Sequence, residues 1–446
     1  MRASIPSPSP KILLAFELEI SDFYVHMKGI GYRIQTIYWG WYVVLGAFLI
    51  LVLTYGVRYS FGVFVRPMFI EYGWPMSVIS LAASINVLTY AVFGVFCGRL
   101  VDNIAPKWLM TAGSIVTALG FYCLIHAETP LGIYLSYGFL CGIGSACNGA
   151  VVGSAAVGKW FIRKRGMAMG FTTMGIGVGT MVMNPVAAYI VAHFDWRTGF
   201  IFFGALIFVF GILISQLLMG KNAPEDIGLR PDGDAAPPGH AASGAIPLRK
   251  KNSLKPVMKD FRFWLLAICN GLAVVTVMMT FVHQVAYAIS QNIGRVEAAA
   301  ALGIVGLSSS CGKFIFGWLC DRLTDAKYAA SLGFLMMALG MLFLLKADAV
   351  YRLYLSSMVY GFGYGSMSPV MPYLISNRFG RHILGTAFGA LVFFVAGIGG
   401  SIGPALGGWI FDRTGSYSSA WAFNAVVLAV VSVLILFLKP AKKLQT

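Results

Sequence analysis

Long apolar segments separated by short polar ones make up most of the chain from residue 38 onward. A run of about 20 predominantly apolar residues is enough for a helix to cross the hydrocarbon core of a bilayer. By this criterion we expect twelve membrane helices near residues 39–64, 77–97, 108–126, 131–157, 166–192, 198–219, 261–289, 297–320, 328–346, 351–377, 383–410 and 418–438. The predicted fold class is an all-α membrane protein, and the even helix count places both termini on one side.

The second half of the chain repeats the first at a constant offset in residue number. The pattern Gly98-x-Leu100-x-Asp102 recurs as Gly317-x-Leu319-x-Asp321, and the same offset relates Gly142 to Gly361, Gly166 to Gly385 and Pro185 to Pro404. Two parallel membrane halves with a site between them, near the bilayer midplane, are typical of many secondary transporters. We therefore expect a tail (1–37), a six-helix half (38–220), a linker (221–260), a second six-helix half (261–438) and a short tail (439–446).

Composition and charge agree with this division. The chain is 58% hydrophobic and 11% charged, with a mean hydropathy of +0.77, which is too apolar for a soluble globular protein. The net charge of +16 could suggest a nucleic-acid partner, but most of the Lys and Arg residues fall in segments on one side of the predicted membrane. This positive-inside bias predicts that both termini and the linker are cytoplasmic, in a cell (inner or plasma) membrane. We expect a monomer in the lipid bilayer and no nucleic acid.

Lys313 lies inside an apolar run long enough to be a membrane helix. A cation at the centre of a bilayer costs roughly 2.5 to 3.5 kcal/mol or more unless something compensates it. Ser310, Ser309 and Gly306 precede Lys313 by three, four and seven residues and share its helical face, which suits a cavity wall better than lipid. Two interpretations remain open: Lys313 is the counter-ion of an anionic substrate, or its long side chain reaches back to the nearby interface.

Other polar residues inside apolar runs are weaker candidates for a binding site. Arg58, near the outer end of the first helix, could attract anions to a vestibule or anchor to lipid headgroups. His283 could relay protons or be a hydrogen-bonded structural histidine. Asn148, Tyr364 and Ser368 could line a cavity or simply pack against neighbouring helices.

Asp102 and Asp321 each stand at the end of a predicted helix. A carboxylate there can accept hydrogen bonds from the N-terminus of an adjacent helix, or pair with a loop arginine such as Arg99, Arg163 or Arg322. Such contacts can exist in only one of two conformations. Asp102 and Asp321, together with Arg99 and Arg322, are therefore predicted to gate the cytoplasmic side. The alternative is that these side chains are simply solvated in the loops.

Several classes of function are not expected. The seven cysteines lack metal-type spacing and fit small core positions, so we expect no metal and no cofactor. An enzyme would want a paired acid and base, yet no histidine has a carboxylate at helical spacing within the membrane. The chain also has no nucleotide-binding motif, which argues against an ATP-driven pump. A transporter-like membrane receptor stays an alternative, although no soluble signalling domain is present.

Three segments resemble the signatures of one transporter family. The run W-G-W-Y-V-V-L-G-A-F from Trp39, the segment Lys159-Trp160-Phe161-x-Arg163-Lys164-Arg165-Gly166 and the motif that begins Gly403-Pro404 are similar to those of the monocarboxylate transporters. The segment 98–107 is similar to the loop motif of the major facilitator superfamily, to which that family belongs. The resemblance covers residues 38 to about 438. It implies a twelve-helix major facilitator fold and secondary, proton-coupled transport of small organic monocarboxylates. The related oxalate and formate exchangers, which need no proton carrier, imply carboxylate exchange as the alternative.

The chain departs from the family pattern in the predicted eighth helix. There the family typically has an Asp and an Arg one turn apart, whereas this chain has Ser309 and Lys313. In the first helix, Tyr59 stands where the animal members carry a lysine, with Arg58 beside it. The resemblance therefore implies an anion site at Lys313, Arg58 and Tyr59. Since no carboxylate accompanies Lys313, the lysine itself could act as both counter-ion and proton carrier.

Overall fold

A computed structural model describes residues 38–234 and 254–440, and its described residues from Gly40 onward form one compact unit. The whole predicted N-terminal tail, residues 441–446 of the predicted C-terminal tail and residues 235–253 of the predicted linker lie outside the described residues. Helices account for nearly all of the described chain, in agreement with the all-α prediction.

The first half contains the six predicted membrane segments. They are formed by α2 (Trp39–Tyr59), α3 (Phe61–Tyr72), α4 (Met76–Asn103), α5 (Pro106–Ile125), α6 (Pro130–Ile133), η1 (Tyr134–Leu140), α7 (Cys141–Asn148), α8 (Ala150–Trp160), α9 (Arg165–His193), α10 (Trp196–Leu206), η2 (Ile207–Gly211) and α11 (Ile212–Leu218). The predicted first helix is longer than expected, because α3 continues α2 beyond a break at Ser60. Gly149, with extended backbone, divides the fourth segment into α7 and α8.

The second half repeats this plan. After the short η3 (Pro224–Ile227), η4 (Pro231–Gly233) and α12 (Leu254–Met258), it consists of α13 (Phe261–Ser290), α14 (Arg295–Arg322), α15 (Lys327–Leu344), α16 (Val350–Gly365), α17 (Met367–Phe379), η5 (Arg381–Ile383), α18 (Leu384–Val392), η6 (Phe393–Gly399), α19 (Gly400–Thr414), α20 (Ser418–Leu434) and η7 (Ile435–Phe437). Eleven helical stretches of the described chain are long and apolar enough to cross a membrane, and the tenth predicted span is the pair α16 and α17.

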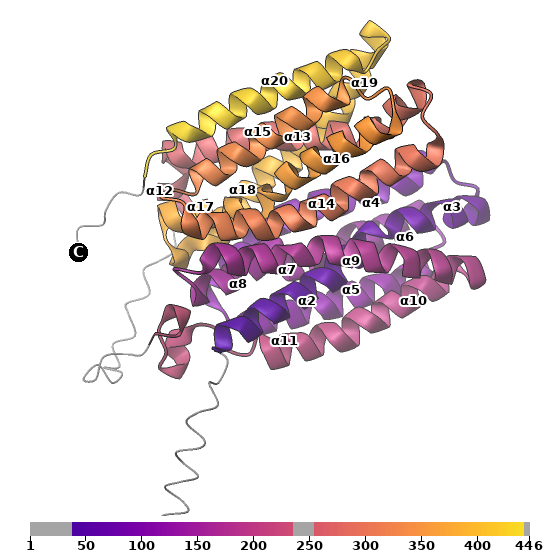
Figure 1. Ribbon diagram of the computed structural model, residues 1–446. Helices are drawn as coiled ribbons and strands as arrows, with labels where there is room; N and C mark the ends of the chain where they lie inside the picture. Colours follow the sequence, from indigo (N-terminus) through magenta and orange to yellow (C-terminus); the bar gives the residue numbers. More distant parts are fainter. Residues whose placement is uncertain (1–37, 235–253, 441–446) are drawn as a thin grey trace, which may run out of the picture. The chain divides into compact units, whose positions relative to one another are not determined.

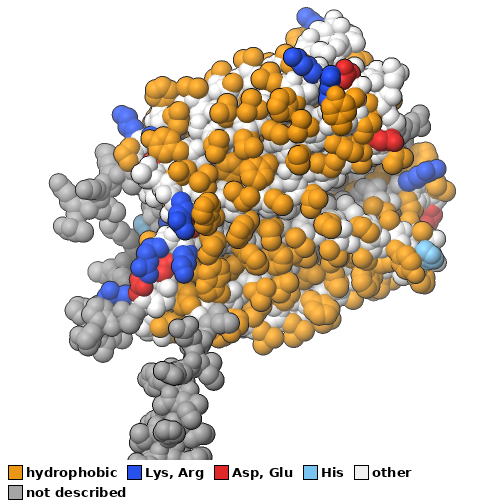
Figure 2. Space-filling view, viewed as in Figure 1, with side chains coloured by type: hydrophobic (Ala, Val, Ile, Leu, Met, Phe, Trp, Pro, Cys, Tyr) orange, Lys and Arg blue, Asp and Glu red, His pale blue; other side chains and the backbone are white. Residues whose placement is uncertain are grey.

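The long helices run side by side, so that α2 begins and α20 ends at the same end of the bundle (Figure 1). Apolar side chains cover the flank in view, whereas Lys and Arg gather toward the ends, above all where α2 begins (Figure 2). We call this the basic end; it carries Arg99, Lys159, Arg163 and Arg381. An apolar flank between charged ends is the surface expected of a protein surrounded by lipid.

The two halves meet through close backbone contacts near the basic end. Helix α4 packs against α18, and α9 packs against α14. A Cβ atom added to Gly98 would lie 2.1 Å from the carbonyl oxygen of Gly385, and one added to Gly166 would lie 2.1 Å from that of Gly317. Only glycine permits this approach, so any larger residue would push the halves apart.

Candidate functional site

Lys313 lies on α14, where that helix contacts both halves. A Cβ atom added to Gly170 of α9 would lie 2.6 Å from the Lys313 carbonyl oxygen, and one added to Gly365 of α16 would lie 2.8 Å from its backbone nitrogen. The residue is only 3% exposed. This burial disfavours a side chain that reaches out to the interface, and it leaves the ammonium in a desolvated position between the halves.

Within the described ranges, no charged partner accompanies this ammonium. Among the residues that the structure describes, the Lys313 side chain takes part in no ion pair and no hydrogen bond. Ser309, one turn away, turns its hydroxyl back to the Gly306 carbonyl oxygen of its own helix at 2.8 Å. Burying an unpaired charge is costly, because the desolvation is not offset by an opposite charge. An anion that enters the site would supply the missing partner.

Arg58 and Tyr59 belong to a group of aromatic side chains at the end of α2. The Arg58 guanidinium carbon lies 4.4 Å from the centre of the Tyr90 ring of α4, a cation–π contact. The Tyr90 hydroxyl lies 2.9 Å from that of Tyr55. Tyr59 is 53% exposed. No acidic side chain pairs with Arg58 within the described ranges, so its charge remains available to an anion.

The C-terminal half contributes Tyr364 and Ser368. The Tyr364 ring packs edge-on against Phe281 of α13, with 5.6 Å between the ring centres. Ser368, half-buried at the start of α17, follows one turn later. Arg58 of α2 is thus in direct contact with Tyr90 of α4, and the other half contributes Tyr364 of α16 and Ser368 of α17.

Two predicted site residues have partners that fit the alternative, structural interpretation. The Asn148 side chain pairs with the Ser114 hydroxyl of α5 at 3.2 Å. The Nε2 atom of His283 lies 2.9 Å from the Pro404 carbonyl oxygen of α19, and its ring packs against Tyr417. Each residue thus binds a neighbouring helix of its own half, and we leave both out of the site proposed below.

The two predicted gating carboxylates bind helix N-termini of the opposite half. Asp102 accepts hydrogen bonds from the Gly385 amide at 2.9 Å, the Thr386 amide at 2.8 Å and the Thr386 hydroxyl at 2.7 Å. We call these the α18 contacts. Such bonds combine a charged acceptor with the positive end of the helix dipole.

Asp321 makes the equivalent contacts on the other side of the repeat. It accepts from the Gly166 amide at 2.7 Å and the Met167 amide at 2.8 Å, at the start of α9. The predicted arginine partners are not used: Arg99 and Arg322 are exposed, neither forms an ion pair among the described residues, and Arg322 lies over the Trp318 ring. The two expected partners of these carboxylates were a helix N-terminus and a loop arginine. In the structure, both carboxylates bind a helix N-terminus.

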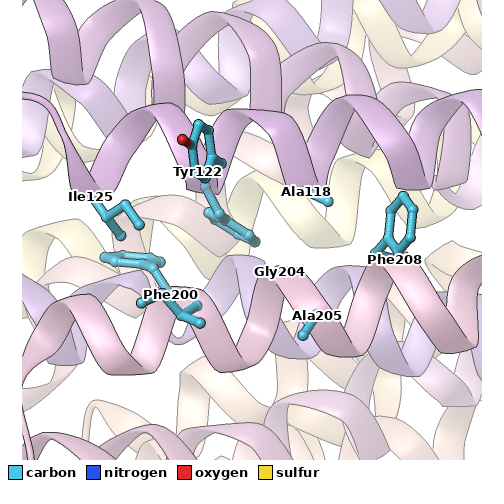
Figure 3. Close-up of a pocket in the computed structure, with 9 residues that line it drawn as sticks. Ala118, Tyr122, Ile125, Phe200, Gly204, Ala205 and Phe208 are labelled. Carbon is cyan, nitrogen blue, oxygen red and sulfur yellow. The ribbon is translucent and has the colours of Figure 1, made fainter.

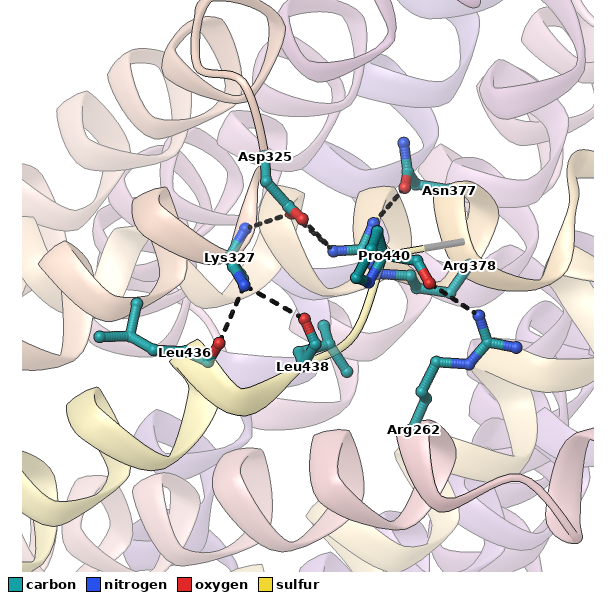
Figure 4. A network of polar contacts seen from close by, with 8 residues as sticks. All are labelled: Arg262, Asp325, Lys327, Asn377, Arg378, Leu436, Leu438 and Pro440. Atoms are coloured by element: carbon teal, nitrogen blue, oxygen red, sulfur yellow. Dashed lines mark hydrogen bonds and ion pairs between the residues drawn. The ribbon is translucent and has the colours of Figure 1, made fainter. Parts of the chain in front are cut away.

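The basic end of the second half is tied together by a separate network (Figure 4). The Arg378 and Asp325 side chains form a buried ion pair with an N···O distance of 2.5 Å. Lys327 donates to the carbonyl oxygen of Leu436 at 2.9 Å, and Arg262 donates to that of Pro440 at 3.3 Å. These bonds join the ends of helices α13, α15 and α17 and the segment after α20.

A hollow in the first half is apolar and separate from the charged residues (Figure 3). It has a volume of about 240 Å³ and is lined by Ala118, Phe121, Tyr122, Ile125, Phe200, Ile201, Gly204, Ala205 and Phe208. Tyr122, Ile201 and Phe208 are exposed on the flank. The hollow therefore belongs to the lipid-facing surface, and none of its lining residues carries a charge that would pair with a carboxylate.

Tyr90 could not be predicted as a site residue from the sequence. It is a tyrosine in an apolar run, and nothing in its spacing relates it to Arg58, which lies on another helix. Tyr55 could have been found, because it precedes Arg58 by three residues on the same helix.

Comparison with known proteins places these features in a wider group. The family model of the Major Facilitator Superfamily matches residues 47–399 and, in a second match, 285–446. Monocarboxylate transporter 13 of Bos taurus is 29% identical over 401 residues, which cover 89% of this chain and 89% of the relative. Monocarboxylate transporter 12 of Mus musculus is 27% identical and is covered to 87%, with 91% of this chain aligned.

Solved structures of low sequence identity share the fold. The fucose:proton symporter of E. coli superposes with a TM-score of 0.67 at 16% identity, over 90% of this chain and all of the symporter. A human organic anion transporter superposes with a TM-score of 0.64 at 13% identity, over 89% of this chain and 99% of that one.

Proposed function

Because the chain belongs to the Major Facilitator Superfamily, and is a membrane transporter related to the monocarboxylate transporters, we propose that it carries small organic monocarboxylates by alternating access of its two halves. The predicted twelve-helix fold, and the prediction of a transporter rather than an enzyme, are confirmed by the same comparisons. The substrate class, the coupling and the site residues are the proposal.

The observation that carries the proposal is the buried, unpaired ammonium of Lys313. A carboxylate that enters between the halves gains an ion pair in a desolvated site, and the protein gains the partner that the charge lacks. Arg58 would attract the anion to the outer vestibule, while the hydroxyls of Tyr59, Tyr364 and Ser368 would hydrogen-bond it on its way to Lys313. A compact ammonium is a point charge, so it suits small acids of varied shape.

We assign the basic end to the cytoplasm, in the cell membrane. The concentration of Lys and Arg at this end supports the assignment through the positive-inside rule. The α18 contacts of Asp102 and the α9 contacts of Asp321 then close the cytoplasmic side of a carrier that faces outward. A topology reporter fused after Lys259 tests this directly: it should report the cytoplasm, and an extracellular signal would reverse the orientation.

Two coupling modes follow from the missing carboxylate partner of Lys313. In proton symport, the ammonium loses its proton when the site is empty and regains one when the anion binds, so that acid and proton cross together without net charge. In exchange, the ammonium stays charged and the empty carrier cannot reorient, so one anion must leave as another enters. Exchange is the second candidate function, because no acidic side chain of the described chain pairs with Lys313 and could carry a proton.

Uptake into proteoliposomes distinguishes these modes. A panel of radiolabelled two- to five-carbon acids is offered to vesicles with and without an inward proton gradient, and to vesicles preloaded with unlabelled acid. Accumulation driven by the gradient indicates symport, whereas uptake that needs preloading indicates exchange. If no acid of the panel is taken up under either condition by protein that is folded and correctly inserted, the proposed substrate class is wrong.

A further inference from the structure

The first residues after α11 fold back onto the basic end, although the sequence indicated only a hydrophilic linker. Residues 221–234 contain the short helices η3 and η4 and lie beside the loop between α8 and α9. Their contacts divide into two sets, one to each half of the protein.

Asp232 attaches this segment to the first half. Its carboxylate accepts hydrogen bonds from three consecutive backbone amides: Ile162 at 3.0 Å, Arg163 at 2.9 Å and Lys164 at 3.2 Å. Its side chain is 3% exposed, and its φ of 64° is a left-handed conformation that few residues besides glycine adopt. Asn222 adds a hydrogen bond from Lys159 at 2.7 Å. Because the Asp232 carboxylate accepts three backbone hydrogen bonds from an unusual backbone conformation, we infer that the segment docks at one specific place on the first half.

Glu225 attaches the same segment to the second half. Its carboxylate forms an ion pair with Arg381 of η5 at 2.5 Å. The other nitrogen of this guanidinium donates to the Lys159 carbonyl oxygen at the end of α8, at 3.0 Å. Arg381 of the second half therefore holds both the segment 221–234 and the end of α8 in the first half.

We propose that residues 221–234 form a strap that holds the basic end closed, anchored through Asp232 and clasped through Glu225 and Arg381. When the halves separate at this end, the Glu225–Arg381 pair must break, while the Asp232 anchor remains intact because its three amide partners all belong to the first half. The Asp232 carboxylate also continues to accept hydrogen bonds from the amides just before α9 after Asp321 has moved away from that helix. The proposal rests on the rocking motion of the proposed function but not on the identity of its substrate.

Distance measurement between the halves tests the strap without any transport assay. Nitroxide labels are placed at Trp108→Cys of α5 and Tyr328→Cys of α15, both exposed on the flank near the basic end, in protein whose natural cysteines are replaced by serine. Double electron–electron resonance then reports the populations of the closed and open states.

Glu225→Gln should raise the open-to-closed ratio about two- to fivefold, the range for a single ion pair of partial exposure. The double variant Glu225→Arg with Arg381→Glu should lower the ratio relative to Arg381→Glu alone, because the swap restores the ion pair but not the hydrogen bond to the Lys159 carbonyl oxygen. Asp234→Asn is the matched control, because Asp234 pairs with Arg163 and both stay with the first half. Asp232→Asn should in addition speed amide hydrogen exchange throughout residues 221–234.

The outcomes separate the strap from the rocking motion itself. If Asp102→Asn opens the basic end but Glu225→Gln leaves the ratio unchanged, the strap proposal is wrong and the motion stands. An Asp234→Asn effect as large as that of Glu225→Gln would also overturn it, because the effect would then come from surface charge. If neither Asp102→Asn nor Glu225→Gln alters the distances, both the strap and the rocking of these halves fail.

Discussion

Replacing Asp102 with asparagine should shift the protein toward the state that is open at its basic end. In the closed state this carboxylate accepts three hydrogen bonds from the start of α18, and all three must break when the halves separate. Asparagine keeps the size of the side chain but loses the charge, and it directs an NH₂ group toward amide donors. Loss of a charged hydrogen-bond acceptor costs about 1.5 to 3 kcal/mol, so the ratio of open to closed states should rise about ten- to hundredfold.

Asp321→Asn should act in the same direction but more weakly. Its carboxylate accepts two hydrogen bonds rather than three, and Asp232 continues to cap the loop before the same helix. The repeat therefore makes the two variants a matched pair that differs in the number of bonds lost.

Reactivity of a buried cysteine measures the shift. Leu384 is fully buried at the start of α18, in contact with Gly158 of α8, so a cysteine at this position should be shielded while the basic end is closed. In protein with the natural cysteines replaced, Asp102→Asn should raise the rate of maleimide labelling at Leu384→Cys by the same ten- to hundredfold, when opening is fast relative to labelling. An unchanged rate in protein of native thermal stability would refute the reasoning.

Two further predictions concern residues outside the proposed anion path. The His283→Gln variant should still accumulate the acid under a proton gradient, since the His283 ring binds the Pro404 carbonyl oxygen as a structural group. If His283→Gln still binds the acid but no longer accumulates it under the gradient, His283 lies on the proton route. Arg378→Met should destabilise the protein by about 3 to 5 kcal/mol in thermal unfolding, because it leaves the Asp325 carboxylate without its buried partner. Arg352→Met, which breaks an exposed pair with Asp348, is the control and should cost at most about 1 kcal/mol; equal losses would contradict the argument.

The helices could be predicted because the bilayer imposes a length and a composition on each of them. The repeat went further, since it relates Asp102 to Asp321 and Gly166 to Gly385, the residues that form the contacts between the halves. The sequence left two modes of binding open for these carboxylates. The choice between them depends on backbone amides and on the glycines that let the helices approach, and these become visible only once the helices are packed.

The direction in which a polar side chain points could not be predicted from the apolar segments. Nearly every face of a membrane helix is apolar, so Asn148 and His283 could equally have pointed into a cavity or toward a neighbouring helix. Tyr90 lies beneath Arg58 through a contact between two helices, which no spacing within one helix reveals. The strap was missed for a related reason: its Pro-, Gly- and Asp-rich composition is typical of linkers, and its order comes from amides and an arginine elsewhere in the chain.

Counterflow in proteoliposomes tests the role of Lys313 most directly. Vesicles preloaded with the acid identified in the uptake panel exchange it for external labelled acid, which requires binding and reorientation but no gradient. The account predicts exchange by the native protein and by Lys313→Arg, which keeps the charge, and none by Lys313→Gln, which keeps much of the length without it. Exchange by Lys313→Gln at the native rate would show that the buried ammonium is not the counter-ion of the substrate.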